Sequence, residues 1–120
     1  MFPDLIALLV AYLKPRVEAT VVGDVPDGWD YRKPIVHVAD VGGPGVIHRV
    51  LDQRRVSFYV THPDRGKASA LAESIRELIQ EYQGGPWYWV TDTGAVAYLP
   101  DGDVRKPRYV YTARINTKRV

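Results

Sequence analysis

The strongest pattern in the chain is an amphipathic helix that lies between an apolar run and a glycine-rich turn. Apolar residues recur at helical spacing over residues 68–82, and charged or polar residues fall outside that stripe. The stripe consists of Ala68, Leu71, Ala72, Ile75, Leu78, Ile79 and Tyr82, and the residues outside it include Lys67, Glu73, Arg76, Glu77 and Gln80. A helix with one apolar face needs a second layer to cover that face, so the pattern predicts a helix packed on another element. Gly84-Gly85-Pro86 predicts its end.

The turn before this helix contains Gly66-Lys67, which raises the question of a phosphate-binding loop. That motif requires a glycine five positions before Gly66, where this chain has Thr61, and a hydroxyl residue after the lysine, where it has Ala68. The segment therefore reads as a strand joined to a helix, with Asp64 as the predicted helix cap. The second glycine-rich stretch, residues 41–45, precedes no predicted helix and indicates a loop or tight turn.

Alternating apolar residues predict strands on both sides of the long helix. We expect a first helix over residues 5–13, strands over 17–22, 35–41 and 50–61, and later strands over 87–91, 95–99 and 109–117. In the third strand Val56, Phe58 and Val60 share one face. In the last strand the shared face carries Tyr109, Tyr111, Ala113 and Ile115. Strands in runs predict an α+β fold, with a mostly antiparallel sheet, two main helices packed on it and a single domain over residues 1–120.

The residue types argue against most kinds of chemistry. The chain has no cysteine, and its three histidines, His37, His48 and His62, have no zinc-type spacing. No serine has a nucleophile-elbow context. We therefore expect no enzyme, no catalytic residue, no cofactor and no metal. The apolar run at residues 5–13 is too short to span a bilayer and lacks a signal-peptide pattern, so we expect a cytoplasmic protein without a membrane partner.

The net charge of +2 conceals an asymmetry. Residues 105–120 carry six basic residues and no acidic one; without those six, 10 Lys and Arg remain against 14 acids, so residues 1–104 carry about −4. A basic end fits either a nucleic-acid contact or a contact with the acidic face of a neighbouring copy. Trp87 and Trp89 could form a stacking platform for single-stranded nucleic acid, or they could pack the sheet against a helix or against a second subunit.

Three segments together resemble the tail terminator family of long-tailed, non-contractile bacteriophages, in particular phages of mycobacteria. They are "MFPDLIALLVAYL", "RRVSFYVTHPDRGKASALAESIRELIQ" and "YLPDGDVRKPRYVYTARINTKR", which together span most of the chain. In the family they correspond to a leading helix, a strand followed by an Ala- and Leu-rich helix, and a turn into the last strand. The chain departs from the family pattern at "THPDRGKASA" and "GGPWYW".

The resemblance implies a structural subunit of the virion, assembled in the host cytoplasm at the tail–neck junction. Six copies would form a ring that ends tail-tube polymerisation and presents the head-attachment surface. The implied partners are the tail tube protein and a head-completion or connector protein, and DNA would pass through the ring without specific binding. A head-side neck protein is the alternative, followed by a small nucleic-acid-binding module.

If the chain forms this ring, we expect six residues to lie at subunit or tube contacts: Arg54, Arg55, Trp87, Trp89, Arg114 and Lys118. The loops at residues 24–33 and 41–48 are expected to contribute. Reversing the charge of the four basic residues should block ring formation, because a head-to-tail ring joins two different surfaces of the same chain.

Overall fold

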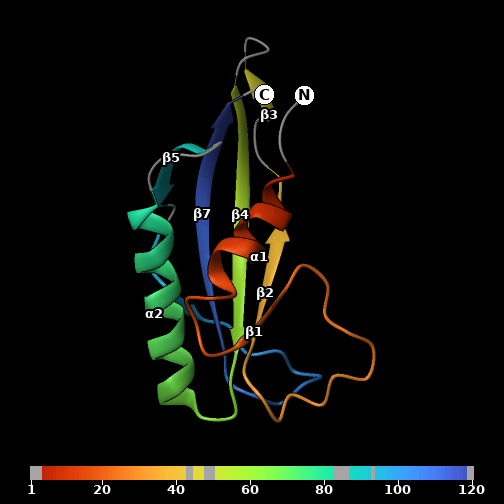
Figure 1. Ribbon diagram of the computed structural model, residues 1–120. Helices are drawn as coiled ribbons and strands as arrows, with labels where there is room; N and C mark the ends of the chain where they lie inside the picture. Colours follow the sequence, from red (N-terminus) through yellow and green to blue (C-terminus); the bar gives the residue numbers. More distant parts are fainter. Residues whose placement is uncertain (1–3, 43–44, 48–50, 83–86, 93, 119–120) are drawn as a thin grey trace.

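The computed structural model describes residues 4–42, 45–47, 51–82, 87–92 and 94–118, and the side chains of residues 45–47, 51, 87–89, 92 and 118 are outside that description. Within these described residues the chain forms two helices and a seven-stranded sheet (Figure 1). The elements in chain order are α1 (Leu5–Leu13), β1 (Thr20–Val22), β2 (Ile35–Asp40), β3 (Gly45–Ile47), β4 (Leu51–Thr61), α2 (Arg65–Glu81), β5 (Trp87–Asp92), β6 (Ala97–Tyr98) and β7 (Arg108–Lys118). The strand order is β1-β2-β4-β7-β5, with β3 paired to β4 and β6 to β7. Only β1 and β2 pair in parallel among these strands, so the predicted α+β fold with a mostly antiparallel sheet is confirmed.

The centre of the sheet is a long ribbon of β4 and β7, which pair over their whole length from Leu51–Lys118 to Thr61–Arg108. The register places Phe58 opposite Tyr111 and Val56 opposite Ala113. Successive side chains of a strand point to opposite faces, so this register fixes one apolar face across both strands. The predicted alternation of the third and last strands is therefore correct.

Both helices lie on that apolar face, as Figure 1 shows. α2 buries Ala68, Ala72, Ile75 and Ile79, and α1 buries Leu5, Leu9 and Leu13 in the same core. The two helices are joined by Tyr12, whose hydroxyl donates to the Leu78 carbonyl at 2.8 Å and whose ring meets Tyr82 edge to face. Burial in this core raises the pKa of Tyr12. Neither helix in the described part of the chain is long and apolar enough to cross a membrane.

The start of α2 is fixed by Asp64, as the sequence predicted. Its Oδ1 accepts a hydrogen bond from the Lys67 backbone N–H at 2.9 Å. We expect Asp64→Ala to lower the free energy of unfolding by about 1 kcal/mol, because one N–H of the first turn loses its acceptor. Urea denaturation of this variant beside Asp64→Asn, which keeps an acceptor, measures the effect. An equal loss in both variants would contradict this account of the cap.

Three predicted element boundaries are wrong. The first strand covers only Thr20–Val22, because residues 17–19 form a bend after the turn that ends α1. The loop expected at residues 41–48 contains β3, whose Gly45 pairs with Gln53 of β4. The strand expected at residues 95–99 shortens to Ala97–Tyr98, where it pairs with β7.

Candidate functional site

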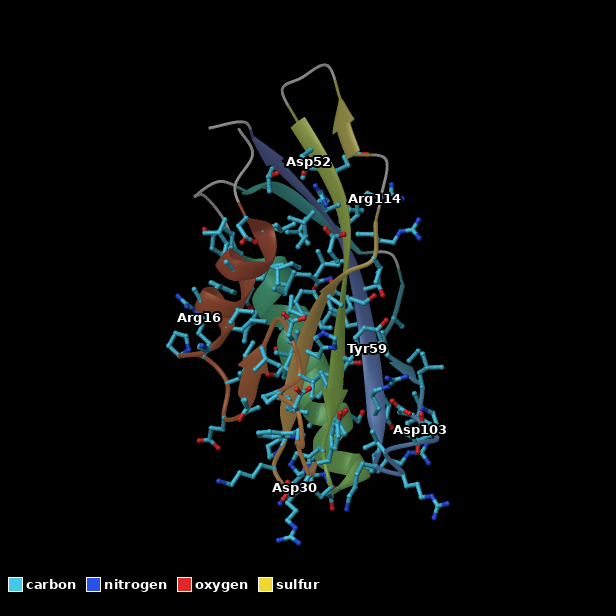
Figure 2. The ribbon with its side chains drawn as sticks, turned by 90° about the vertical axis from the view of Figure 1, so that its right-hand side faces the viewer. Arg16, Asp30, Asp52, Tyr59, Asp103 and Arg114 are labelled. Atoms are coloured by element: carbon cyan, nitrogen blue, oxygen red, sulfur yellow. The ribbon has the colours of Figure 1, made fainter. Side chains whose placement is uncertain are left out.

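The candidate site lies on the sheet face that points away from α1 and α2, which we call the outer face. On the central ribbon this face carries Arg55, Ser57, Tyr59 and Thr61 of β4 opposite Arg114, Thr112, Val110 and Arg108 of β7. In the described part of the chain no helix covers it. Figure 2 shows Arg114 and Tyr59 on the side of the ribbon away from the helices. The outer face therefore has no helix layer over it, although the side chains of Ser57 and Thr61 on it are buried.

One end of the outer face is closed by the chain itself. Arg108 donates through Nε to the Leu99 carbonyl at 2.8 Å, and its guanidinium also lies 3.6 Å from an Asp101 carboxylate oxygen. The same guanidinium stacks over the Tyr59 ring, 5.0 Å from its centroid. These contacts hold the segment after β6 against the sheet. The cavity left beside them has a volume of about 160 Å³, well below the roughly 300–1,000 Å³ typical of small-molecule sites.

The other end of the outer face is an open groove of about 640 Å³. The sheet forms its floor, and the segment from Gly94 to Leu99 forms a wall of mostly small side chains. The lining residues are Arg55, Thr91, Gly94, Ala95, Ala97, Leu99, Val110, Thr112 and Arg114. Leu99 is one of the large apolar side chains that stay exposed. The groove thus combines two cations, two hydroxyls and an exposed apolar rim.

The two arginines of the groove are directly opposite each other on neighbouring strands. No acidic side chain among the described residues lies within ion-pair distance of either one. Cβ atoms of directly opposed residues are about 4.5–5.5 Å apart, and like charges in that position destabilise a sheet. We therefore expect this pair to cost the fold some stability.

This cost gives a direct test. We expect Arg55→Thr to raise the free energy of unfolding of the monomer by about 0.2–1 kcal/mol, because it removes a like-charge cross-strand pair. Arg55→Lys keeps the charge and should give little change. Urea denaturation at low protein concentration measures both. A clear loss of stability in Arg55→Thr would mean that Arg55 has a stabilising partner within the subunit.

The structure separates the six predicted interface residues. Arg55 and Arg114 meet in the groove, whereas Arg54 is on the opposite face of the sheet, toward the helices. The side chains of Trp87, Trp89 and Lys118 are outside the described residues. Their backbones place them at one end of the sheet, since Trp87 pairs with Thr117 and Lys118 with Leu51. Their interface role stays a prediction.

Arg54 is held inside the subunit by two carboxylates. Its Nε donates to Asp52 at 2.8 Å and its Nη1 donates to Asp40 at 2.6 Å. The hydrogen bond to Asp52, with that to Asp40, raises the pKa of Arg54. The Asp52 side chain is only 6% exposed; Arg54 binds its Oδ2, and its Oδ1 has no hydrogen-bond partner among the described residues. Arg54 is thus the counter-ion of a buried carboxylate, a role that the sequence did not suggest.

Several polar side chains away from the groove arginines make hydrogen bonds within the fold. A ring nitrogen of His37 lies 3.1 Å from the Gly23 carbonyl, and Nδ1 of His62 accepts from the Asp64 backbone N–H. Ser57 and Thr112 share a hydrogen bond of 2.8 Å across the central ribbon. The part of the chain that the structure describes holds no group of three or more His, Cys, Asp or Glu that suits a metal. The prediction that the chain catalyses no reaction stays a prediction.

Sequence reasoning did not find Thr91, Thr112, Leu99 or the small-residue wall of the groove. The signal for the arginines was present, because Arg55 and Arg114 alternate out of the apolar faces of their strands. What makes them a pair is the register of two strands far apart in the sequence. A comparison of the chain with models of known protein families found no match, and a search of curated proteins found no relative.

Proposed function

We propose that this chain is a structural assembly protein that caps a phage tail tube as a hexameric ring. The observation that carries the proposal is the open groove of the outer face, where Arg55 and Arg114 lack a described counter-charge. A subunit surface with uncompensated charge and an exposed apolar rim suits a contact with another protein. The resemblance to tail terminators supplies the particular role: to end tube growth and to present the head-attachment surface.

The order of elements supports the same role. The three segments that carry the resemblance form α1, then β4 with α2, then β6 with the turn into β7. These are a leading helix, a strand followed by a helix, and a turn into the last strand. The partners on this proposal are further copies of the chain, the tail tube protein and a head-completion or connector protein. DNA would cross the ring without specific binding, and the protein would reside at the tail–neck junction of the virion.

The proposal is tested by polymerising the purified tail tube protein of a phage that encodes this chain, with and without the chain. We expect added chain to shorten the tubes and to appear as a ring at one tube end in electron micrographs. Unchanged tube lengths with bare ends would contradict the terminator role. Binding to filled heads in place of tubes would assign the chain to the head side of the junction, which is the alternative we retain.

Nucleic-acid binding is the second candidate, because the groove arginines are also suited to phosphates. If the two arginines contact two phosphates of a single strand, the logarithm of the binding constant should fall with the logarithm of the salt concentration with a slope of only about −1.4. A gel-shift measurement with single-stranded DNA at low salt tests this function. Binding that Arg55→Thr weakens would support it, and no binding at low salt would exclude it.

A further inference from the structure

The outward side of α2 carries an acidic stripe opposite in charge to the groove. Glu73, Glu77 and Glu81 are exposed and follow one another at intervals of four residues, so they share one face of the helix. The residues that α2 buries against the sheet point the other way. Glu73 has a loose contact with Arg76 at 3.8 Å, and among the described residues Glu77 and Glu81 have no cation within ion-pair distance.

The acidic stripe and the groove lie on opposite sides of the sheet. Figure 1 shows α2 packed on the same face of the sheet as α1. Figure 2 shows Arg114 on the other side of the ribbon formed by β4 and β7. One copy therefore cannot bring its own α2 into its own groove. Two copies that face the same way can make this contact, because α2 of one copy then meets the groove of the next. A contact between two different surfaces is what generates a ring when the rotation between copies closes.

The spacing of the charges also matches. Four residues of α-helix rise about 6 Å, which separates Glu73 from Glu77 along the helix axis. The directly opposed Arg55 and Arg114 have Cβ atoms about 4.5–5.5 Å apart. Two carboxylates on successive turns can thus each meet one guanidinium, and arginine binds carboxylates through paired hydrogen bonds. The exposed Ala70 on the same helix and the small side chains of the groove wall leave room for close approach.

We propose that the groove at Arg55 and Arg114 receives the outward face of α2, at Glu73 and Glu77, from the neighbouring copy. The inference rests on the proposed ring function and names its subunit interface. It also accounts for the like-charge pair within the subunit, because the carboxylates of the next copy neutralise both arginines. Of the six basic residues in the C-terminal segment 105–120, Arg114 then takes part in this contact.

The test exchanges the charges between the two surfaces. One variant carries Arg55→Glu and Arg114→Glu, and the other carries Glu73→Arg and Glu77→Arg. The first keeps a like-charge cross-strand pair, and the second places good helix formers on an exposed face, so both should fold like the original chain. Analytical ultracentrifugation should show association of each variant alone weakened at least tenfold, because like charges now face each other.

An equal mixture of the two variants should associate again. In the mixture each Glu-bearing groove meets an Arg-bearing helix, and each original groove meets an original helix, so alternating copies restore every contact of an even-numbered ring. The matched control for the groove variant is Lys14→Glu with Arg16→Glu, which makes the same change in net charge as that variant at exposed residues after α1, outside both surfaces. The control should associate like the original chain.

Three outcomes would overturn the inference. Each variant alone could form the original assembly, the mixture could fail to recover while circular dichroism shows both variants folded, or the original chain could stay monomeric at about 1 mM, where even weak contacts are populated. None of these decides the terminator role, which the tube-polymerisation test measures separately. Recovery in the mixture together with unchanged tube lengths would leave the interface standing and remove the terminator function.

Discussion

Replacing Phe58 with alanine is expected to lower the free energy of unfolding by about 3–5 kcal/mol, the range for buried aromatic residues. Phe58 is fully buried in the centre of β4, and its ring stacks on that of Tyr111 across the ribbon, with centroids 5.8 Å apart. Both helices pack on the core that contains this pair. The truncation removes apolar contacts and leaves a cavity that a sheet held by two long paired strands cannot easily collapse.

The matched control for this prediction is Tyr98→Ala. Tyr98 is also an aromatic residue of a strand, but it is 40% exposed, and its ring is covered by the guanidinium of Arg65. We expect a loss of less than about 1 kcal/mol there, since little apolar area leaves the core. Urea denaturation of both variants gives the comparison. Equal losses would contradict the assignment of the core to the helix-covered face.

Replacing Arg54 with methionine is the second substitution with a large expected effect. Methionine keeps an unbranched stem but removes the guanidinium that binds Asp52 and Asp40. The buried Asp52 carboxylate then loses its charged partner. A buried polar group left without its partner costs about 1–3 kcal/mol, and more for a charged group. Because the Arg54 side chain is 44% exposed, and water can therefore reach it, we expect a loss of about 1–3 kcal/mol.

The control for Arg54→Met is Arg32→Met. Arg32 also pairs with an aspartate, Asp30 at 3.5 Å, but the two side chains are 86% and 61% exposed. Exposed ion pairs contribute about 0–1 kcal/mol, so this variant should unfold almost like the original chain. If Arg54→Met instead kept its stability and lost self-association, Arg54 would belong to the interface, as the sequence suggested.

Much of the fold follows from local patterns that the sequence displays. The α2 stripe and the Asp64 cap predicted that helix, because both depend on residues within a few positions of each other. The alternation of β4 and β7 predicted which side chains face the core. The short strands were harder to predict. β3 begins at a glycine, and β1 has three residues, so each is defined by its pairing partner and not by its own composition.

The groove could not be predicted from the sequence, for a related reason. Arg55 and Arg114 are 59 positions apart in the chain, and only the register of β4 with β7 makes them neighbours. The same holds for Arg54. Its sequence neighbour Arg55 looks equivalent, yet alternation sends the two side chains to opposite faces, one to buried carboxylates and the other to the groove. Two adjacent cations thus have different roles.

The most direct measurement of the central claim is electron microscopy of particles from a phage whose copy of this chain has been deleted. A tail terminator predicts over-long, headless tails beside filled heads, because nothing ends tube growth or offers the head a docking surface. Tails of normal length beside unattached, leaking heads would place the protein on the head side of the junction. Normal infectious particles would contradict the assembly role altogether.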